Sequence, residues 1–308
     1  MSAAAAFPQF ARYAQHLRTL TWRDMAKRAW LILLGMIALK WMLPADLGSG
    51  MRPLILVAPI LPFIAKDLSH WPDALDRLRA AIAGRAWARV LGAGWPPELI
   101  GLLRLDAAMR RGFVNWLRRR PQPALPAGQA FTYLERGSYR TGIAIALMAT
   151  LFELPLDAAL LPLLPPTLVD PHKVGLLHAL LAAGVLSTLV WVLGDRWHIG
   201  RGCHVLTADG LELRVGARTH GTIALDAIAD CRRIDLTPDA WCRREGIACH
   251  KTLLASPLDK QNTVLILKAN SRVRLTHIGV ERTGLDCVFL YVDQPDRLGA
   301  AVRSGRQQ

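Results

Sequence analysis

Two long apolar runs, separated by a short polar break, constrain the fold of this chain most strongly. They cover residues 141–164 and 174–193. At about 1.5 Å of rise per residue, each run is long enough as a helix to cross a hydrocarbon core of about 30 Å. The pattern therefore predicts an antiparallel transmembrane hairpin within residues 129–200. The ionisable side chains inside the two runs are Glu153, Asp157 and His178.

The composition agrees with a membrane class. Of the 308 residues, 52% are hydrophobic, which is more apolar material than one soluble core of this length requires. A formal net charge of +14 is also typical of nucleic-acid binders, but here the basic residues are interleaved with apolar runs instead of filling one polar domain. We therefore expect the lipid bilayer, with its anionic headgroups, as the partner, and no nucleic acid.

Two shorter apolar runs, at residues 29–43 and 53–65, precede this hairpin. They predict a first hydrophobic hairpin over residues 29–65, after a cytoplasmic N-terminal segment at residues 1–28. Both runs are short for full spans and two prolines interrupt the second, so two interpretations stay open. The runs form either two short transmembrane helices or a re-entrant pair buried against other helices.

The distribution of Lys and Arg predicts the orientation. Five lie in residues 1–28, thirteen in 66–140 and seventeen in 196–308, whereas the connecting loops 44–52 and 165–173 hold one each. By the positive-inside rule, we expect a multi-pass protein of the cell inner (plasma) membrane with cytoplasmic N- and C-termini. No secretory signal is apparent, so the first apolar run is expected to be retained.

Residues 66–128 form a basic amphipathic segment between the two hairpins. Within it, Leu, Ile, Val and Trp recur with Arg at helical spacing over residues 85–121, broken at two adjacent prolines. This pattern predicts an interfacial amphipathic helix pair, and a solvated helix packed on the rest of the protein is the alternative. The stretch AFTYLE at residues 130–135 alternates like a strand that joins the C-terminal sheet.

From residue 201 to residue 308, short alternating runs separated by turn residues predict a β domain. About six strands and a terminal helix favour a small β-barrel closed by that helix, and an α+β fold class for the whole chain. The expected elements are a hairpin at 204–215, a strand at 221–228, a second hairpin at 265–278, a last strand at 287–293 and a helix at 293–302.

The order of these elements, with a strand ending in LDAI and a final DQPDRL helix, resembles bacterial PH-like domains appended to membrane helices. More broadly, YRTGIAIALMATLFELPLDAALL, followed by a span ending in LGDRWH, resembles a group of uncharacterised bacterial integral membrane proteins that carry a C-terminal cytoplasmic PH-like domain. The resemblance covers residues 129–302. It implies architecture and little chemistry.

Motifs for metal binding and catalysis are weak. The five cysteines all fall in the C-terminal third, and Cys242, Cys249 and His250 lack the tight pairs of structural zinc sites. No G-x-S-x-G, H-E-x-x-H, P-loop or G-x-G-x-x-G pattern occurs. We predict no metal site and no cofactor, and the sequence gives no support for an enzyme.

The two intramembrane acids are the sharpest chemical signal. Glu153 and Asp157 are four residues apart and should share one side of their helix. Asp157 and His178 should lie at similar depth, which predicts a contact between them. Three interpretations stay open: an interhelical polar clamp around the nearby proline, a ligand or ion site, and hydration of a shallow Asp157. Two ridges of small residues are expected to let the helices approach closely: Gly142, Ala146 and Thr150, and Gly175, Ala179, Ala183 and Ser187.

Three basic residues of the expected second hairpin, Lys268, Arg272 and Arg274, are candidate contacts for lipid or a partner. The leading functional hypothesis is a binding or scaffolding protein whose PH-like domain engages a protein partner or an anionic lipid surface. The alternative is a small transporter or membrane ligand sensor centred on Glu153, Asp157 and His178. The sequence specifies no oligomeric state.

Overall fold

A computed structural model gives the fold of the chain. The chain divides into two compact units, Met1–Pro97 and Glu98–Gln308. The expected connecting loops at 44–52 and 165–173 lie mainly outside the described residues. Described are residues 17, 22–44, 51–69, 71–84, 95–160, 174–256, 258–269 and 271–306.

The first unit is helical. Its elements are α2 (Trp22–Met42), α4 (Arg52–Val57), η2 (Ala58–Ile60), α5 (Leu61–Ser69) and α6 (Trp71–Ala83). Helix α2 packs against α4, η2 and α5, so the predicted first hairpin is a helical pair. Pro53–Ser69 and Ala74–Ala80 together reach the length and hydropathy of one span, across a bend of 54°. Such a bend occurs in a broken span and in a re-entrant loop, so both interpretations of this hairpin remain.

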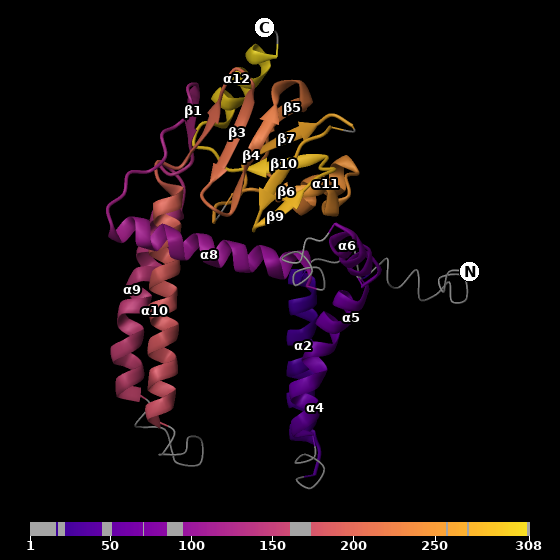
Figure 1. Cartoon of the computed structure of the whole chain (residues 1–308), viewed down its shortest axis with the longest axis vertical. Helices are drawn as coiled ribbons and strands as arrows, with labels where there is room; N and C mark the ends of the chain where they lie inside the picture. Colours follow the sequence, from indigo (N-terminus) through magenta and orange to yellow (C-terminus); the bar gives the residue numbers. More distant parts are fainter. Residues whose placement is uncertain are drawn as a thin grey trace, which may run out of the picture. The chain divides into compact units, whose positions relative to one another are not determined.

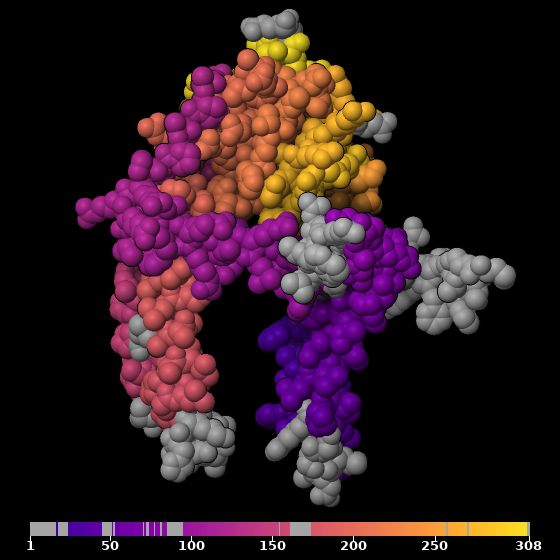
Figure 2. Space-filling model, in the orientation of Figure 1, coloured from indigo at the N-terminus to yellow at the C-terminus, as the bar shows by residue number. Residues whose placement is uncertain are grey.

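The second unit contains the predicted helical hairpin, α9 (Tyr139–Leu160) and α10 (Val174–Ile199). Within the described part of the chain, these are the two helices that are individually long and apolar enough to cross a membrane. They pack against each other, yet only 6% of the most apolar window of each is buried. Figure 2 shows the pair standing clear of the β domain. The exposed apolar surface is typical of helices that face lipid.

Helix α8 (Pro97–Leu117) and two sheets complete the second unit (Figure 1). One sheet has six antiparallel strands in the order β1-β2-β3-β4-β8-β9, and the other has four in the order β5-β7-β10-β6. The strands are β1 (Gln129–Thr132), β2 (Cys203–Leu206), β3 (Gly210–Val215), β4 (Thr219–Ala224), β5 (Ile228–Arg233), β6 (Thr252–Leu254), β7 (Thr263–Leu267), β8 (Leu275–His277), β9 (Val280–Arg282) and β10 (Cys287–Leu290). The remaining elements are η5 (Leu225–Ala227), α11 (Pro238–Glu245), η6 (Cys249–Lys251) and α12 (Pro295–Gly305).

The two sheets share one hydrophobic core, which α12 closes. Leu213 of β3 and Leu265 of β7 are fully buried in it, together with Leu298 and Val302 of α12. On its other face, the four-stranded sheet is covered by α11, whose Trp241 ring meets Phe289 edge-on at 5.5 Å between centroids. The α+β class and the terminal helix are therefore confirmed. The expected barrel is not formed among the described strands, because neither sheet closes on itself.

The first predicted β-hairpin is correct and the second is wrong. Strands β2 and β3 pair antiparallel with Leu206 opposite Leu211. In contrast, β7 and β8, which the sequence joins as a hairpin at 265–278, lie in different sheets. The reason is that β7 pairs with β5 along one edge and with β10 along the other, so it has no free edge for β8. Strand β8 pairs with β4 and β9 instead.

The strand predicted at 130–135 forms as β1 but ends at Thr132, and it joins the sheet as expected. Strand β1 pairs antiparallel with β2, with Phe131 opposite His204. In the order of the chain, α9 and α10 therefore lie between β1 and β2, two strands that pair directly with each other. The start of α9 and the end of α10 therefore both lie at the β domain.

Candidate functional site

The structure separates the environments of Glu153 and Asp157, the two acids of α9. Asp157 is half-buried on the face of α9 that carries the buried Thr150, whereas Glu153 is exposed. Asp157 Oδ2 and His178 Nε2 are shielded from solvent, and neither has a hydrogen-bond partner among the described residues. The expected Asp157–His178 contact is therefore not made as a hydrogen bond. The three interpretations of these groups, a polar clamp, a ligand or ion site and a hydrated Asp157, stay predictions.

One of the two predicted small-residue ridges lies at the helix pair. Gly142 and Ala146 are half-buried and Thr150 is buried. On α10 the ridge is exposed instead, and Val185 is the buried side chain at that level of the helix. Because α10 is apolar on all sides, its pattern does not reveal which face packs. The exposed members of the α10 ridge are Gly175, Ala179, Ala183 and Ser187.

The three basic residues assigned to the second hairpin are exposed, but they do not share a strand. Lys268 follows β7 and lies beside Asp209 and Arg306 around a surface hollow. Arg272 and Arg274 precede β8 in the other sheet. Arg274 lies 3.5 Å from the Glu281 carboxylate. The structure therefore gives no single basic strand for lipid or partner binding, although each residue remains accessible.

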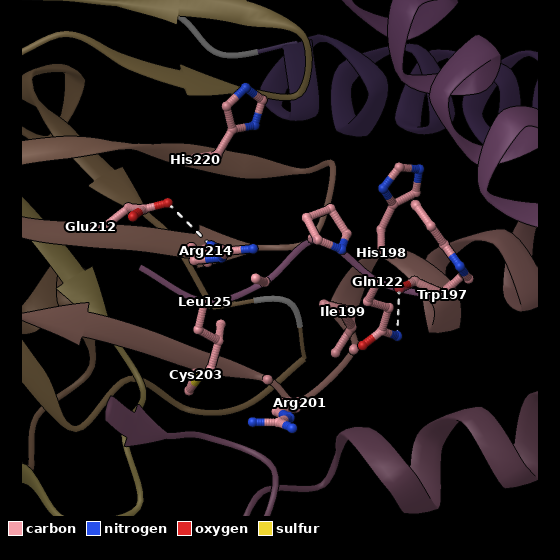
Figure 3. Close-up of a pocket in the computed structure, with 15 residues that line it drawn as sticks. Gln122, Leu125, Trp197, His198, Ile199, Arg201, Cys203, Glu212, Arg214 and His220 are labelled. Carbon is pink, nitrogen blue, oxygen red and sulfur yellow. Dashed lines mark hydrogen bonds and ion pairs between the residues drawn. The ribbon is translucent and has the colours of Figure 1, made fainter. Parts of the chain in front are cut away.

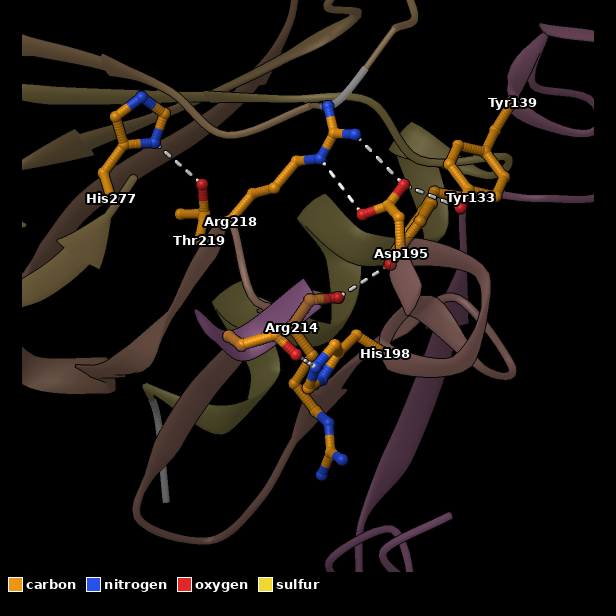
Figure 4. Close-up of polar contacts among 9 residues, drawn as sticks. Tyr133, Tyr139, Asp195, His198, Arg214, Arg218, Thr219 and His277 are labelled. Carbon is orange, nitrogen blue, oxygen red and sulfur yellow. Dashed lines mark hydrogen bonds and ion pairs between the residues drawn. The ribbon is translucent and has the colours of Figure 1, made fainter. Parts of the chain in front are cut away.

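A buried aspartate joins the helical hairpin to the β domain (Figure 4). Asp195, in the last turn but one of α10, is 1% exposed. Arg218, from the β3–β4 turn, donates to both of its carboxylate oxygens at 3.1 Å. The hydroxyl of Tyr139, the first residue of α9, donates to Oδ2 at 2.9 Å. One carboxylate thus holds the start of α9, the end of α10 and a β-turn together.

Two further aspartates hold the chain where it enters α9. Asp293 accepts hydrogen bonds from the backbone N–H groups of Glu135 and Arg136, at 3.0 and 2.9 Å. Asp259 Oδ1 accepts hydrogen bonds from the backbone N–H and the hydroxyl of Ser138, the residue before the helix. A carboxylate near a helix N-terminus is favourable because the unpaired N–H groups there carry partial positive charge. The β domain therefore fixes the entry to the hairpin as well as its exit.

Buried polar contacts also order the neighbouring strands. Tyr133 donates its hydroxyl proton to the Arg214 carbonyl at 2.8 Å, and His204 Nδ1 accepts from the Arg214 N–H at 3.2 Å. Burial lowers the pKa of His204 to about 4. In the same sheet, His277 contacts the Thr219 hydroxyl at 2.8 Å, and burial lowers its pKa to about 4 as well. Both imidazoles are therefore neutral at pH 7.

Helix α8 crosses α10 at very short range. A Cβ atom added at Gly194 would lie 2.0 Å from the Met109 carbonyl oxygen, so only glycine fits there. Two side chains of α10 bond to α8 beside this contact. Trp191 Nε1 donates to Asp106 at 2.7 Å, and His198 Nε2 lies 2.9 Å from the Ala108 carbonyl oxygen.

The N-terminal half of α8 is attached to the β domain. Gly101 packs against the β8–β9 turn, where a Cβ atom would lie 2.5 Å from the Ile278 carbonyl oxygen. Gly279 in that turn has a φ of +71°, a conformation that favours glycine. Glu98, in the first turn of α8, lies 3.9 Å from Arg282 of β9. Contacts at two places along its length thus fix α8 against both α10 and the sheet.

The opposite face of α8 is exposed and carries an apolar stripe that Arg110 interrupts, since Arg110 lies between Leu103 and Val114 and pairs with Asp106 at 2.7 Å. Leu103 and Leu117 are 62% and 63% exposed, and Val114 is exposed beside them. Arg111 and Arg118 lie seven residues apart along one side of this face, and Arg104, one heptad earlier, donates to the Gly279 carbonyl in the β8–β9 turn at 3.5 Å. An apolar stripe flanked by arginines is typical of a helix that lies in a membrane interface. A helix runs from Pro97 to Leu117, as both interpretations of this segment require, and residues 85–94 lie outside the described part, so the interfacial helix pair stays a prediction.

A cavity of about 640 Å³ opens beside the end of α10 (Figure 3). Its volume is in the range of small-molecule sites. The outer face of strands β3 and β4 forms one wall, the linker at 122–125 forms another, and the turn after α10 completes it. The charged and polar lining side chains are Gln122, His198, Arg201, Cys203, Glu212, Arg214 and His220.

The electrostatics of the cavity follow from the alternation of β3. Leu211 and Leu213 point into the core, so Glu212 and Arg214 point to the opposite face and form an ion pair at 3.3 Å. His220 lies opposite Arg214 on β4, and burial, followed by the nearby His198, lowers its pKa. With Arg201 added, the lining contains two guanidinium groups and one carboxylate. The lining therefore carries a net positive charge.

The sequence analysis did not predict the contact between Asp195 and Arg218. Asp195 reads in the sequence as the charged residue that ends an apolar span, although it is one of the most buried polar residues described. Its available signal was its position one turn before the helix end, where a buried acid requires a partner. Arg218 lies in a turn without any pattern that would indicate this partner.

Comparison with protein-family models, curated proteins and solved structures gave no match. Among the described residues, no group of three or more His, Cys, Asp or Glu side chains is arranged to hold a metal ion. The geometry of the second unit is therefore the basis for any functional assignment.

Proposed function

We propose that this protein is a membrane-embedded binding protein that engages an anionic lipid surface. In this account α9 and α10 cross the bilayer, and the β domain is a PH-like domain on the cytoplasmic side. Two sheets around one core with a C-terminal helix support the PH-like assignment. The excess of Lys and Arg in residues 196–308 supports the orientation.

The observation that carries this proposal is the exposed face of α8. The helix is attached to the end of α10 at which the β domain lies, so its apolar stripe sits where a bilayer around α9 and α10 would end. Leucines of that stripe bury apolar area in the interface, and Arg111 and Arg118 lie at headgroup level. Each basic residue near an anionic surface contributes about 1 kcal/mol.

The test compares arginines on α8 with arginines elsewhere. The double variant Arg111→Gln/Arg118→Gln removes two exposed positive charges, one from α8 and one from the residue that follows it. The matched control Arg243→Gln/Arg303→Gln removes two exposed charges from α11 and α12. In proteoliposomes, the association of spin-labelled phosphatidylglycerol relative to phosphatidylcholine should fall severalfold in the α8 variant, and also when salt is raised.

The control variant should retain the lipid selectivity of the native chain. Equal selectivity in all three proteins, or selectivity that does not change with salt, would contradict a role for α8 at an anionic surface. The lipid measurement is made on the full chain, so it needs no assumption about independent folding of the β domain.

One observation favours the second candidate, a transporter or ligand sensor. Asp157 Oδ2 and His178 Nε2 are polar atoms shielded within the helix pair, each without a hydrogen-bond partner among the described residues. Polar groups at such positions commonly mark ion or substrate paths. Under this candidate, a monovalent cation raises the thermal unfolding midpoint of the native chain, and Asp157→Asn abolishes that effect.

A further inference from the structure

The cavity beside the end of α10 is built by residues that are far apart in sequence. The linker at 122–125, the turn at 200–203 and strands β3 and β4 supply its walls. Gln122 Nε2 donates to the Trp197 carbonyl at 3.0 Å, which fixes the linker against α10. The cavity is therefore a defined part of the fold, and its lining can be considered as a binding site.

Two arginines reach the cavity from different walls (Figure 3). Arg201 lies between Gly200 and Gly202, which have φ values of +57° and +59° and form a tight turn after α10. Arg214 extends from β3 on the face opposite the core. Guanidinium groups present several N–H donors in a planar fork that matches phosphate oxygens. Two of them lining one cavity can both donate to a single phosphate group.

The other lining groups fit an anion of this kind. Glu212 pairs with Arg214 at 3.3 Å and holds its guanidinium at the wall, while Arg201 is exposed. Gln122 and the neutral His220 add uncharged hydrogen-bonding groups. Leu125 and the glycines add apolar and backbone surface for the rest of a ligand. A carboxylate in the lining disfavours ligands with high negative charge and so favours a phosphate ester over a polyphosphate.

We infer that this cavity is a binding site for a phosphate ester. The inference rests on the proposed function for its most direct ligand source, because the cavity adjoins lipid headgroups when α9 and α10 cross the bilayer. A soluble phosphate ester presents the same chemistry from the aqueous side. The recognition step is the same in both cases: Arg201 and Arg214 bind the phosphate oxygens, and the ester group lies against the linker.

The experiment measures binding to the full chain in a neutral detergent by native mass spectrometry. The probes are dioctanoyl phosphatidylglycerol, glycerol 1-phosphate and dioctanoylglycerol, which lacks a phosphate. Arg201→Gln and Arg214→Gln should each weaken binding of the phosphate-bearing probe about tenfold, as expected for loss of a charge-assisted hydrogen bond. Glu212→Gln should strengthen it severalfold, because it removes the negative charge of the lining.

Arg243→Gln, on α11, is the matched control and should bind as the native chain does. Binding of phosphatidylglycerol alone identifies a lipid headgroup as the source, and binding of glycerol phosphate identifies a soluble ester. Equal binding of dioctanoylglycerol, or native affinity in both cavity arginine variants, would overturn the inference. Thermal unfolding midpoints confirm that each variant is folded, and Arg201→Gln changes only an exposed side chain.

This result is separable from the test of α8. Arginine-dependent binding of glycerol phosphate in the cavity, with no change of lipid selectivity in the α8 variant, would overturn the proposed function and leave the cavity site. Lipid selectivity that depends on α8, without binding in the cavity, would overturn the cavity site and leave the proposed function.

Discussion

Arg218 donates two parallel hydrogen bonds to Asp195, from Nε to Oδ1 and from Nη2 to Oδ2, each at 3.1 Å. The aspartate is 1% exposed and the arginine side chain is 31% exposed. The carboxylate belongs to α10 and the guanidinium to the β3–β4 turn, so this pair connects the candidate membrane hairpin to the β domain. A bidentate pair fixes orientation as well as distance.

Removing one partner of this pair should cost more than removing both. Arg218→Met leaves the buried carboxylate with Tyr139 as its remaining side-chain partner. We expect the free energy of unfolding to fall by about 2–3 kcal/mol. This is less than for a fully buried pair because Arg218 is partly exposed. Asp195→Asn should cost less, since an amide oxygen still accepts a hydrogen bond. Unfolding of the single and double variants measures the coupling. Strictly additive effects would show that the two residues do not act as a pair.

The crossing of α8 and α10 predicts opposite results at two glycines of the same helix. Gly194→Ala places a Cβ atom 2.0 Å from a backbone oxygen of α8. We expect the free energy of unfolding to fall by about 1–3 kcal/mol, because the backbone of one helix must move to make room. Gly184→Ala meets no atom within 4 Å and should be neutral or slightly stabilising, since alanine favours helix. Thermal unfolding in detergent distinguishes them. Equal effects at both positions would contradict the close crossing.

Acid should destabilise the β domain through its buried histidines. Burial lowers the pKa of His204 and His277 to about 4, against about 6.5 for an unfolded histidine. Between these values the unfolded chain binds more protons, so stability is complete above about pH 6.5 and falls as the pH drops toward 4. Each histidine contributes up to about 1.4 kcal/mol per pH unit. His277→Gln should flatten the dependence of the unfolding midpoint on pH in this window, and an unchanged slope would contradict the assignment.

The exposed position of Glu153 changes the expectation for the intramembrane acids. If Glu153 faces lipid, Glu153→Leu should leave the unfolding midpoint unchanged or raise it, because an ionisable group is removed from an apolar environment. Under a clamp formed by Glu153, the same variant would lose up to about 1 kcal/mol of helix packing. Thermal unfolding in detergent, with Glu153→Gln as the isosteric comparison, decides between the two.

Local patterns in the sequence predicted a large part of this fold. The helical hairpin follows from two long apolar runs, and the β2–β3 hairpin follows from alternation around Asp209-Gly210. The terminal helix and the strand at 130–135 follow from patterns of the same kind. Each of these depends on neighbours in sequence, which is why each could be predicted.

The remaining features depend on contacts between distant residues. The separation of β7 from β8 is decided by β5 and β10, which already occupy both edges of β7. The packed face of α10 cannot be identified from a helix that is apolar all round. The cavity combines residues from 122 to 220, and its arginines lie in a turn and a strand that carry no motif. For these features sequence spacing gave no signal.

The depth of α8 tests the central claim most directly. Cys249 is the one exposed residue among the five cysteines, so a Cys249→Ser background allows a single spin label at Leu117→Cys on the outer face of α8. A label at Asp209→Cys, in the exposed β2–β3 turn, is the aqueous reference. In vesicles containing phosphatidylglycerol, the account predicts that the label at 117 is more accessible to oxygen and less accessible to a water-soluble nickel complex than the label at 209. Equal accessibility of the two labels to the nickel complex would place α8 in water and contradict the account.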